Sequence, residues 1–166
     1  PPEATFYCFN RAIRIHPNYY CCGKCCLSLL GTWSGPEWSA CQTLYSLIIT
    51  MRSLLISNPL WQEPGFEGLT NLANQNYNKI ITYHNIQTYI LTVLSDLPKE
   101  FIPLKPVLLH LFYKNYPYIL AKCFQSIHLD KKTVKMKTPY GITTTLNYNS
   151  LINKLQQFYH KFTVNK

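Results

Sequence analysis

Apolar side chains recur with helical spacing in several separate stretches of the chain. Between Cys41 and Ile56 they fall at steps of three and four residues, which predicts an amphipathic helix with one buried stripe. The members of that stripe are Leu44, Leu47, Ile48, Met51, Leu54 and Leu55. Asn58-Pro59 follows and predicts the end of this helix, because proline disfavours a helical conformation in the residue before it.

Helical spacing resumes near Leu72 and continues to Leu97, in a pattern that allows a break near His84. Pro98, Pro103 and Pro106 then mark a junction. The pattern favours a long helical segment before this junction and a new element after it.

Two further helices are predicted beyond the junction. Val107–Ile127 has helical spacing and is expected to bend at Pro117, because an internal proline removes one backbone hydrogen bond and clashes with the preceding turn. Residues 149–162 predict a closing helix capped by Asn149 or Ser150.

Strand patterns occur at both ends of the chain. Residues 4–9 are rich in strand formers after Pro1-Pro2 and predict a strand, while Thr133–Leu146 predicts a hairpin turning at Pro139-Tyr140-Gly141. The segment from Leu60 to Thr70 is expected to be an ordered loop in which Trp61 and Phe66 contact the core. Helices and separate strands together predict an α+β fold.

The composition indicates a folded domain. Of the 166 residues, 47% are hydrophobic and 14% are charged, which excludes an intrinsically disordered segment. The longest apolar stretch, Leu44 to Ile56, is interrupted by Arg52 and is too short to span a bilayer, so no membrane partner is expected. Because the chain begins Pro-Pro-Glu without a methionine, we expect a fragment of a longer protein.

The net charge of +9 comes entirely from the C-terminal part. Residues 1–67 hold four basic and four acidic side chains, whereas residues 68–166 hold twelve basic and three acidic ones. This basic part is first expected to be a solvated face and second a surface for an acidic partner. Its basic residues after 130 are Lys131, Lys132, Lys135, Lys137, Lys154, Lys161 and Lys166. Since no nucleic-acid-binding motif accompanies them, nucleic acid is disfavoured as a partner.

The seven cysteines are an odd number, and four of them lie between residues 21 and 26. This arrangement does not suit a disulfide framework and favours a reducing compartment. Cys22-x-x-Cys25 with His16 and Cys21 nearby permits a zinc site, but a structural zinc normally requires a second ligand pair, and none follows. We therefore predict no metal.

The most informative spacing joins an amide to a thiol. Asn18 ends the tripeptide His16-Pro17-Asn18, and Cys26 follows eight positions later, with both residues in predicted loops. An accessible thiol is a nucleophile and a side-chain amide is a neutral hydrogen-bond donor for an oxyanion, which together suit acyl transfer. No Ser/His/Asp arrangement is recognisable and nothing places a histidine base beside Cys26, so a cysteine hydrolase fits poorly.

These residues resemble the ubiquitin-conjugating enzymes, and most closely the Z type of that family. The resemblance rests on Asn18 and Cys26 and extends over nearly the whole chain. Its further motifs are Gly23-Lys24, Cys26–Trp33, Gly35-Pro36, Trp38-Ser39, Glu63–Glu67, Asn76-Tyr77-Asn78, His128-Leu129, Pro139-Tyr140-Gly141 and Tyr148–Leu151.

The resemblance implies an α+β UBC-like domain truncated at its N-terminus, with a mostly helical C-terminal extension. Residues 1–97 would be the C-terminal portion of the catalytic core and residues 98–166 the family-specific extension. By the same resemblance, Cys26 would accept ubiquitin or a ubiquitin-like modifier as a thioester, and Asn18 would stabilise the oxyanion or hold the loop that frames it. The implied partners are the modifier, an activating enzyme, a ubiquitin ligase and a substrate protein, with no cofactor, in the cytoplasm or nucleus.

Several positions qualify what the resemblance implies. Ala40 replaces the proline of a Trp-Ser-Pro motif, and only Gln62 or Glu63 could help to deprotonate an incoming lysine. His16 and Cys25 are expected to be structural, with the Cys25 side chain on the opposite side from Cys26. The alternative function is an inactive truncated relative that binds a modifier or a ligase as a scaffold.

Overall fold

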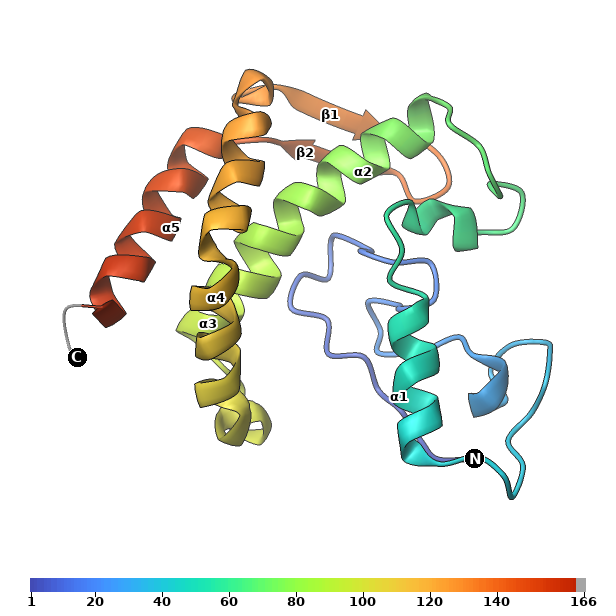
Figure 1. Cartoon of the computed structure of the whole chain (residues 1–166). Helices are drawn as coiled ribbons and strands as arrows, with labels where there is room; N and C mark the ends of the chain where they lie inside the picture. Colours follow the sequence, from blue (N-terminus) through green and yellow to red (C-terminus); the bar gives the residue numbers. More distant parts are fainter. Residues whose placement is uncertain (164–166) are drawn as a thin grey trace. The chain divides into compact units, whose positions relative to one another are not determined.

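The computed structural model describes residues 1–163, in which α-helices accompany a two-stranded antiparallel sheet (Figure 1). This confirms the predicted α+β class. The chain divides into two compact units. The first comprises residues 1–78 with 137–142, and the second comprises residues 79–136 with the chain from Thr143 onward.

The first helix, α1 (Leu44–Ser53), lies inside the predicted range. It begins where it does because Thr43 and Ser46 form a capping box. The Thr43 hydroxyl accepts from the Ser46 N–H at 3.1 Å, and the Ser46 hydroxyl accepts from the Thr43 N–H at 2.9 Å. Two backbone donors that a helix start leaves unpaired are thereby satisfied.

Only part of the predicted stripe on α1 is buried. Leu47 is 4% exposed and joins the core of the first unit, and Met51 and Leu54 pack against the same core. The prediction of one buried stripe is wrong for its other three members, which are more than 60% exposed: Leu44, Ile48 and Leu55. Helical spacing brings all six side chains to one face, but only Leu47, Met51 and Leu54 on that face contact the core.

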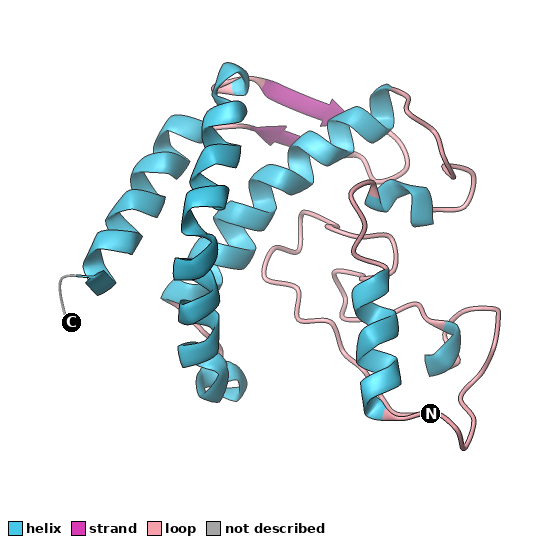
Figure 2. Ribbon diagram, viewed as in Figure 1, coloured by secondary structure: helices cyan, strands magenta, loops and turns pink. Residues whose placement is uncertain are grey.

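The predicted strand at residues 4–9 is absent. Figure 2 shows residues 1–43 as loops with one short helical turn, Ser28–Leu30. Thr5 forms an isolated bridge with Lys24, and the Phe6 N–H donates to the Gly23 carbonyl at 2.8 Å. Gly23 has a φ of +98°, so the partner segment turns away and no ladder can continue.

The loop from Leu60 to Thr70 is ordered, as predicted. It begins with a 3-10 turn, Pro59–Gln62, in which Leu60 is fully buried. The Trp61 indole N–H donates to the Leu69 carbonyl at 2.7 Å and closes the loop on itself. The main apolar anchor of this loop is therefore Leu60, whereas Trp61 and Phe66 are only partly buried.

The helical segment after Leu72 changes its winding where a break was expected. The helix α2 (Leu72–His84) is followed by a π-helix, Asn85–Thr92, and by α3 (Val93–Ser95). The Thr92 hydroxyl donates to the Gln87 carbonyl, five residues earlier, at 3.0 Å. This contact matches the wide winding of a π-helix, a conformation that is rare in proteins.

The second unit is built around α4 (Lys105–Gln125), which follows a 3-10 segment, Lys99–Leu104, at the predicted junction. Pro117 lies inside α4 without ending it. The helices α4 and α5 (Tyr148–Thr163) pack through aromatic pairs, with the Phe112 and Phe158 ring centroids 5.2 Å apart. Among residues 1–163, no helix is long and apolar enough to cross a membrane.

The predicted hairpin is present as β1 (Thr133–Met136) and β2 (Ile142–Thr145). Burial alternates along both strands, as the two-residue period of a strand requires. In the turn between them, the Gly141 N–H donates to the Lys137 carbonyl at 3.0 Å. The Pro139-Tyr140-Gly141 turn therefore lies where its sequence predicts.

The closing helix is capped by Asn147, so the predicted cap at Asn149 or Ser150 is wrong. The Asn147 side-chain carbonyl accepts from the Ser150 N–H at 3.0 Å, which is the contact of a residue just before the first turn. Asn149 instead donates its side-chain N–H to the Asp130 carboxylate at 2.7 Å. The helix begins earlier because the preceding asparagine can already satisfy its free donors.

Replacing the Asn147 cap gives a small effect that tests this assignment. We expect Asn147→Ala to lower the free energy of unfolding by about 1 kcal/mol, since it removes one capping bond. Ser150→Ala, which leaves the cap in place, should cost less. Urea denaturation followed by circular dichroism measures both, and a larger loss for Ser150→Ala would contradict the cap at Asn147.

Candidate active site

Asn18 and Cys26 are clamped together by two hydrogen bonds. The Cys26 backbone N–H donates to the Asn18 carbonyl at 2.8 Å, and the Asn18 side-chain N–H donates to the Cys26 carbonyl at 2.9 Å. The structure thus brings together the two residues that the sequence singled out. The side-chain oxygen of Asn18 is buried and finds no partner among residues 1–163.

Thr32 fixes the backbone on both sides of Cys26. Its hydroxyl donates to the Cys25 carbonyl at 2.6 Å and accepts from the Leu27 N–H at 2.9 Å. Nearby, a side-chain carbon at Gly35 would lie 3.0 Å from Ser28, and the φ of Gly35 is +139°. A larger residue there would be strained, because few residues other than glycine adopt this φ and the Ser28 side chain would have to shift.

The adjacent cysteines have different surroundings. Cys25 is 2% exposed and belongs to the apolar core with Tyr19 and Leu27, as expected of a structural residue. Burial raises the pKa of the Cys25 thiol. Cys26 is 4% exposed and lines a cavity of about 330 Å³. Cys26 therefore borders an open space, whereas Cys25 is enclosed by the core.

His16 supports the segment that carries Asn18. Its Nδ1 accepts from the Asn18 backbone N–H at 3.1 Å, so the proton of a neutral ring lies on Nε2, which donates to the Leu54 carbonyl at 2.9 Å. His16 is 1% exposed. Its contacts are those of a structural residue, in agreement with the expectation.

The pKa of His16 lies below its ordinary value of 6.5. Burial is the main cause; the bond to the Leu54 carbonyl opposes it, and the Arg14 charge adds a smaller lowering. The folded chain therefore binds this proton less tightly than the unfolded chain does. The resulting stability is complete above about pH 6.5 and declines as the pH falls below that value.

Acid sensitivity of the fold tests this environment. We expect the free energy of unfolding to fall as the pH is lowered below about 6.5, and His16→Gln to show a weaker decline. His84, whose pKa burial also lowers, should supply the decline that remains. Chemical denaturation across this pH range measures both proteins. An equal slope for His16→Gln would contradict the assignment.

The cavity beside Cys26 has charged and aromatic groups around it. Its lining includes Arg14, Tyr20, Gln62 and Glu63 in addition to Asn18 and Cys26. The Arg14 guanidinium carbon lies 3.6 Å from the centroid of the Tyr20 ring. Both residues that were considered as helpers for a lysine therefore reach the cavity, and Glu63 is the one that can carry a negative charge.

Tyr140 reaches this site from a distant part of the sequence. Its hydroxyl donates to the Glu63 carboxylate, 77 residues away. Burial is the main cause that raises the pKa of Tyr140, and the bond to Glu63 adds to it, so the phenol stays protonated at neutral pH. The sequence marked Tyr140 only as a turn residue, and no local signal connects it, Arg14 or Tyr20 to Cys26.

The other cysteines do not build a metal site in the described chain. Within residues 1–163, no group of three His, Cys, Asp or Glu side chains is placed to hold a metal ion. Cys21 instead forms a side-chain hydrogen bond with Cys8. Burial, followed by this bond, raises the pKa of Cys21 to about 11.

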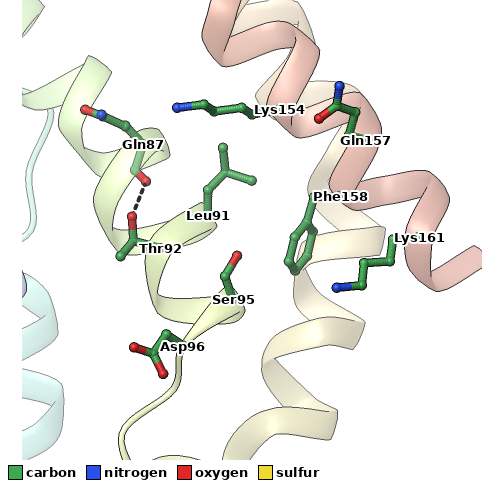
Figure 3. A pocket seen from close by; sticks show the side chains of 9 residues that line it. All are labelled: Gln87, Leu91, Thr92, Ser95, Asp96, Lys154, Gln157, Phe158 and Lys161. Atoms are coloured by element: carbon green, nitrogen blue, oxygen red, sulfur yellow. Dashed lines mark hydrogen bonds between the residues drawn. The ribbon is translucent and has the colours of Figure 1, made fainter.

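A separate pocket of about 430 Å³ lies in the second unit, between the π-helix and α5 (Figure 3). Leu91 and Phe158 form its apolar part, and Lys154 and Lys161 flank it from α5. Neither cysteine nor histidine occurs among the described residues that line it. This pocket therefore contains no thiol or imidazole group among those residues.

The basic residues of the C-terminal part agree with a solvated face. Those that the structure describes are exposed: Lys131, Lys132, Lys135, Lys137, Lys154 and Lys161. Lys166 lies outside the described residues.

Comparisons with known proteins extend what the site geometry indicates. No family model matches the chain. The chain is 34% identical over 154 residues to ubiquitin-conjugating enzyme E2 Z of Xenopus tropicalis, a match that covers 92% of this chain and 49% of the relative. The same enzyme of Homo sapiens is 34% identical over 148 residues, covering 88% of this chain and 41% of the relative.

A plant protein matches a shorter region. The probable ubiquitin-conjugating enzyme E2 25 of Arabidopsis thaliana is 43% identical over 72 residues, or 40% of this chain and 12% of the relative. The chain spans about half of the Xenopus relative and less of the others. Because the E2 Z matches cover about nine-tenths of its length, the chain belongs to the ubiquitin-conjugating enzyme family.

Proposed function

We propose that the protein is a transferase that carries ubiquitin or a ubiquitin-like modifier as a thioester on Cys26. The observation that supports this proposal most directly is the position of Cys26 on the 330 Å³ cavity, where the Asn18 side chain holds its backbone through a hydrogen bond. Family membership supplies the reaction class. A fixed thiol beside an open space can present a bound acyl group to a second nucleophile.

The first step is thioester exchange with an activating enzyme. The Cys26 sulfur gives up its proton and attacks the carbonyl carbon at the modifier's C-terminus. The new C–S bond forms as the bond to the activating enzyme's cysteine breaks, and that sulfur leaves with the electron pair and takes up a proton. Exchange between two thiols is nearly balanced in energy, so positioning is the main requirement.

Asn18 is proposed to act mainly on the loop that presents Cys26. Its side-chain N–H is already bonded to the Cys26 carbonyl, and this contact favours the loop-holding role over direct contact with an oxyanion. A rearranged loop would be needed before the same N–H could reach a reacting carbonyl. Either role affects aminolysis, in which a lysine displaces Cys26.

The remaining proposals follow from the family. Residues 1–97 supply the C-terminal portion of the catalytic core and residues 98–166 the extension, in a protein that acts in the cytoplasm or nucleus. Its partners are the modifier, an activating enzyme, a ligase and a substrate protein. No cofactor is needed, because the chemistry uses side chains alone.

A binding scaffold without turnover is the second candidate function. One observation favours it: Cys26 is only 4% exposed, which restricts access to the sulfur. Ala40 in place of the motif proline points the same way. A scaffold would bind the modifier or a ligase through the same surface without forming a thioester.

A charging assay decides between the two. The chain, and any longer transcript product that contains it, is incubated with ATP, ubiquitin and candidate activating enzymes, and the products are separated on non-reducing gels. We expect an adduct that a thiol reagent removes. Folded protein that binds ubiquitin but forms no adduct with any activating enzyme would favour the scaffold.

A further inference from the structure

The tip of the β1–β2 hairpin belongs to the first compact unit, where it contacts Glu63. Residues 137–142 are part of that unit, and Tyr140 within them donates its hydroxyl proton to the Glu63 carboxylate. Glu63 also lines the cavity that Cys26 lines. Tyr140 is thus linked to the cavity beside Cys26 through a single residue, Glu63.

The Tyr140 ring is fixed on more than one side. It packs edge-on against Tyr77 with ring centroids 5.6 Å apart, and the Arg14 guanidinium carbon lies 4.7 Å from its centroid. Tyr77 is itself fully buried and donates its hydroxyl proton to the Arg14 carbonyl at 2.8 Å. A phenol held in this way can orient its hydrogen-bond partner.

The backbone of Glu63 is also anchored. Its N–H donates to the carbonyl of the fully buried Leu60 at 3.0 Å, at the end of the 3-10 turn. With both backbone and carboxylate held, the side chain loses little further freedom when a substrate arrives. The neighbouring Gln62 is exposed and has no group that can accept a proton from an ammonium ion.

We propose that Tyr140 is a positioning residue that holds the Glu63 carboxylate toward the cavity, so that Glu63 takes the proton from the lysine that attacks the Cys26 thioester. In this step the lysine ammonium gives its proton to Glu63, and the nitrogen lone pair forms the C–N bond. The C–S bond breaks, and the electron pair leaves on the Cys26 sulfur, which takes up the second proton that the nitrogen loses as the amide forms. This inference rests on the proposed transferase function.

Two nucleophiles separate proton removal from the rest of the reaction. Pre-formed ubiquitin thioester is discharged in single turnover, in parallel, with free lysine and with hydroxylamine, which is mostly uncharged near neutral pH and so need not lose a proton before it attacks. We expect Tyr140→Phe to slow discharge to lysine about 10-fold, the size expected for one hydrogen bond to a charged group. Discharge to hydroxylamine should stay within about twofold, as should the charging rate.

The control is Tyr45→Phe, which removes the same hydroxyl from an exposed tyrosine on α1 in the same unit. It should leave every rate unchanged. Glu63→Gln should slow lysine discharge about 100-fold, and adding Tyr140→Phe to it should have little further effect, because the phenol acts through the carboxylate.

The outcomes distinguish this inference from the function on which it rests. If wild-type protein forms no thioester with any activating enzyme, the transferase proposal fails, and this inference fails with it. If the thioester forms and Tyr140→Phe discharges to lysine at the wild-type rate, only the role of Tyr140 is overturned. Equal slowing with both nucleophiles, or additive effects of the two substitutions, would likewise overturn it by showing a general structural role.

Discussion

Cys26→Ser should abolish the thiol-sensitive ubiquitin adduct, whereas Cys25→Ser should retain it. Cys26 lines the cavity, and its sulfur is the proposed acyl carrier, so the substitution removes the reacting atom. Cys25 is 2% exposed in the apolar core, where a serine hydroxyl costs stability through burial of a polar group. Cys25→Ser should therefore reduce the amount of folded protein without changing the charging rate of each folded molecule.

Neighbouring cysteines make this a matched test. Each variant replaces one sulfur with oxygen, and the two positions are adjacent in the sequence. Charging is measured on non-reducing gels after the folded fraction has been determined by circular dichroism. If Cys25→Ser removed the adduct and Cys26→Ser kept it, the family alignment would be displaced by one residue. Loss in both folded variants would indicate that the loop, and not one sulfur, is required.

Asn18→Ala should keep thioester formation but slow aminolysis about 10²-fold, because a small misplacement of the reacting groups can cost a factor of this size. The variant removes the 2.9 Å bond from the Asn18 side chain to the Cys26 carbonyl and so loosens the loop that presents the thioester. Charging by a thiol tolerates this better, since a sulfur nucleophile is intrinsically stronger than a lysine amine.

Charging and lysine discharge are measured separately on the same preparation. Asn18→Asp keeps the size of the side chain while replacing the N–H donor with an acceptor, so it should behave like the alanine variant. Asn149→Ala, which removes an amide from the second unit, serves as the unaffected control. If Asn18→Ala reduced both steps equally, Asn18 would be a folding residue.

Local patterns in the sequence predicted the elements whose causes are local. The helices α1 and α4 and the β1–β2 hairpin lie within or close to their predicted ranges, because periodicity and turn residues act over a few positions. The prediction of a strand at residues 4–9 was wrong because a strand does not depend on local sequence alone. A strand requires an extended partner, and whether that partner turns away at Gly23 is not visible in the strand's own sequence.

The sequence by itself determined which two residues to examine, since the eight-residue spacing from Asn18 to Cys26 is a property of the chain. Tertiary structure alone decided which residues line the cavity beside Cys26, and that only the Leu47 line of α1 is covered. It also brought Tyr140 to Glu63 across 77 positions. Periodicity shows which side chains share a face, but packing between distant segments determines what each face meets, and that packing leaves no local signal.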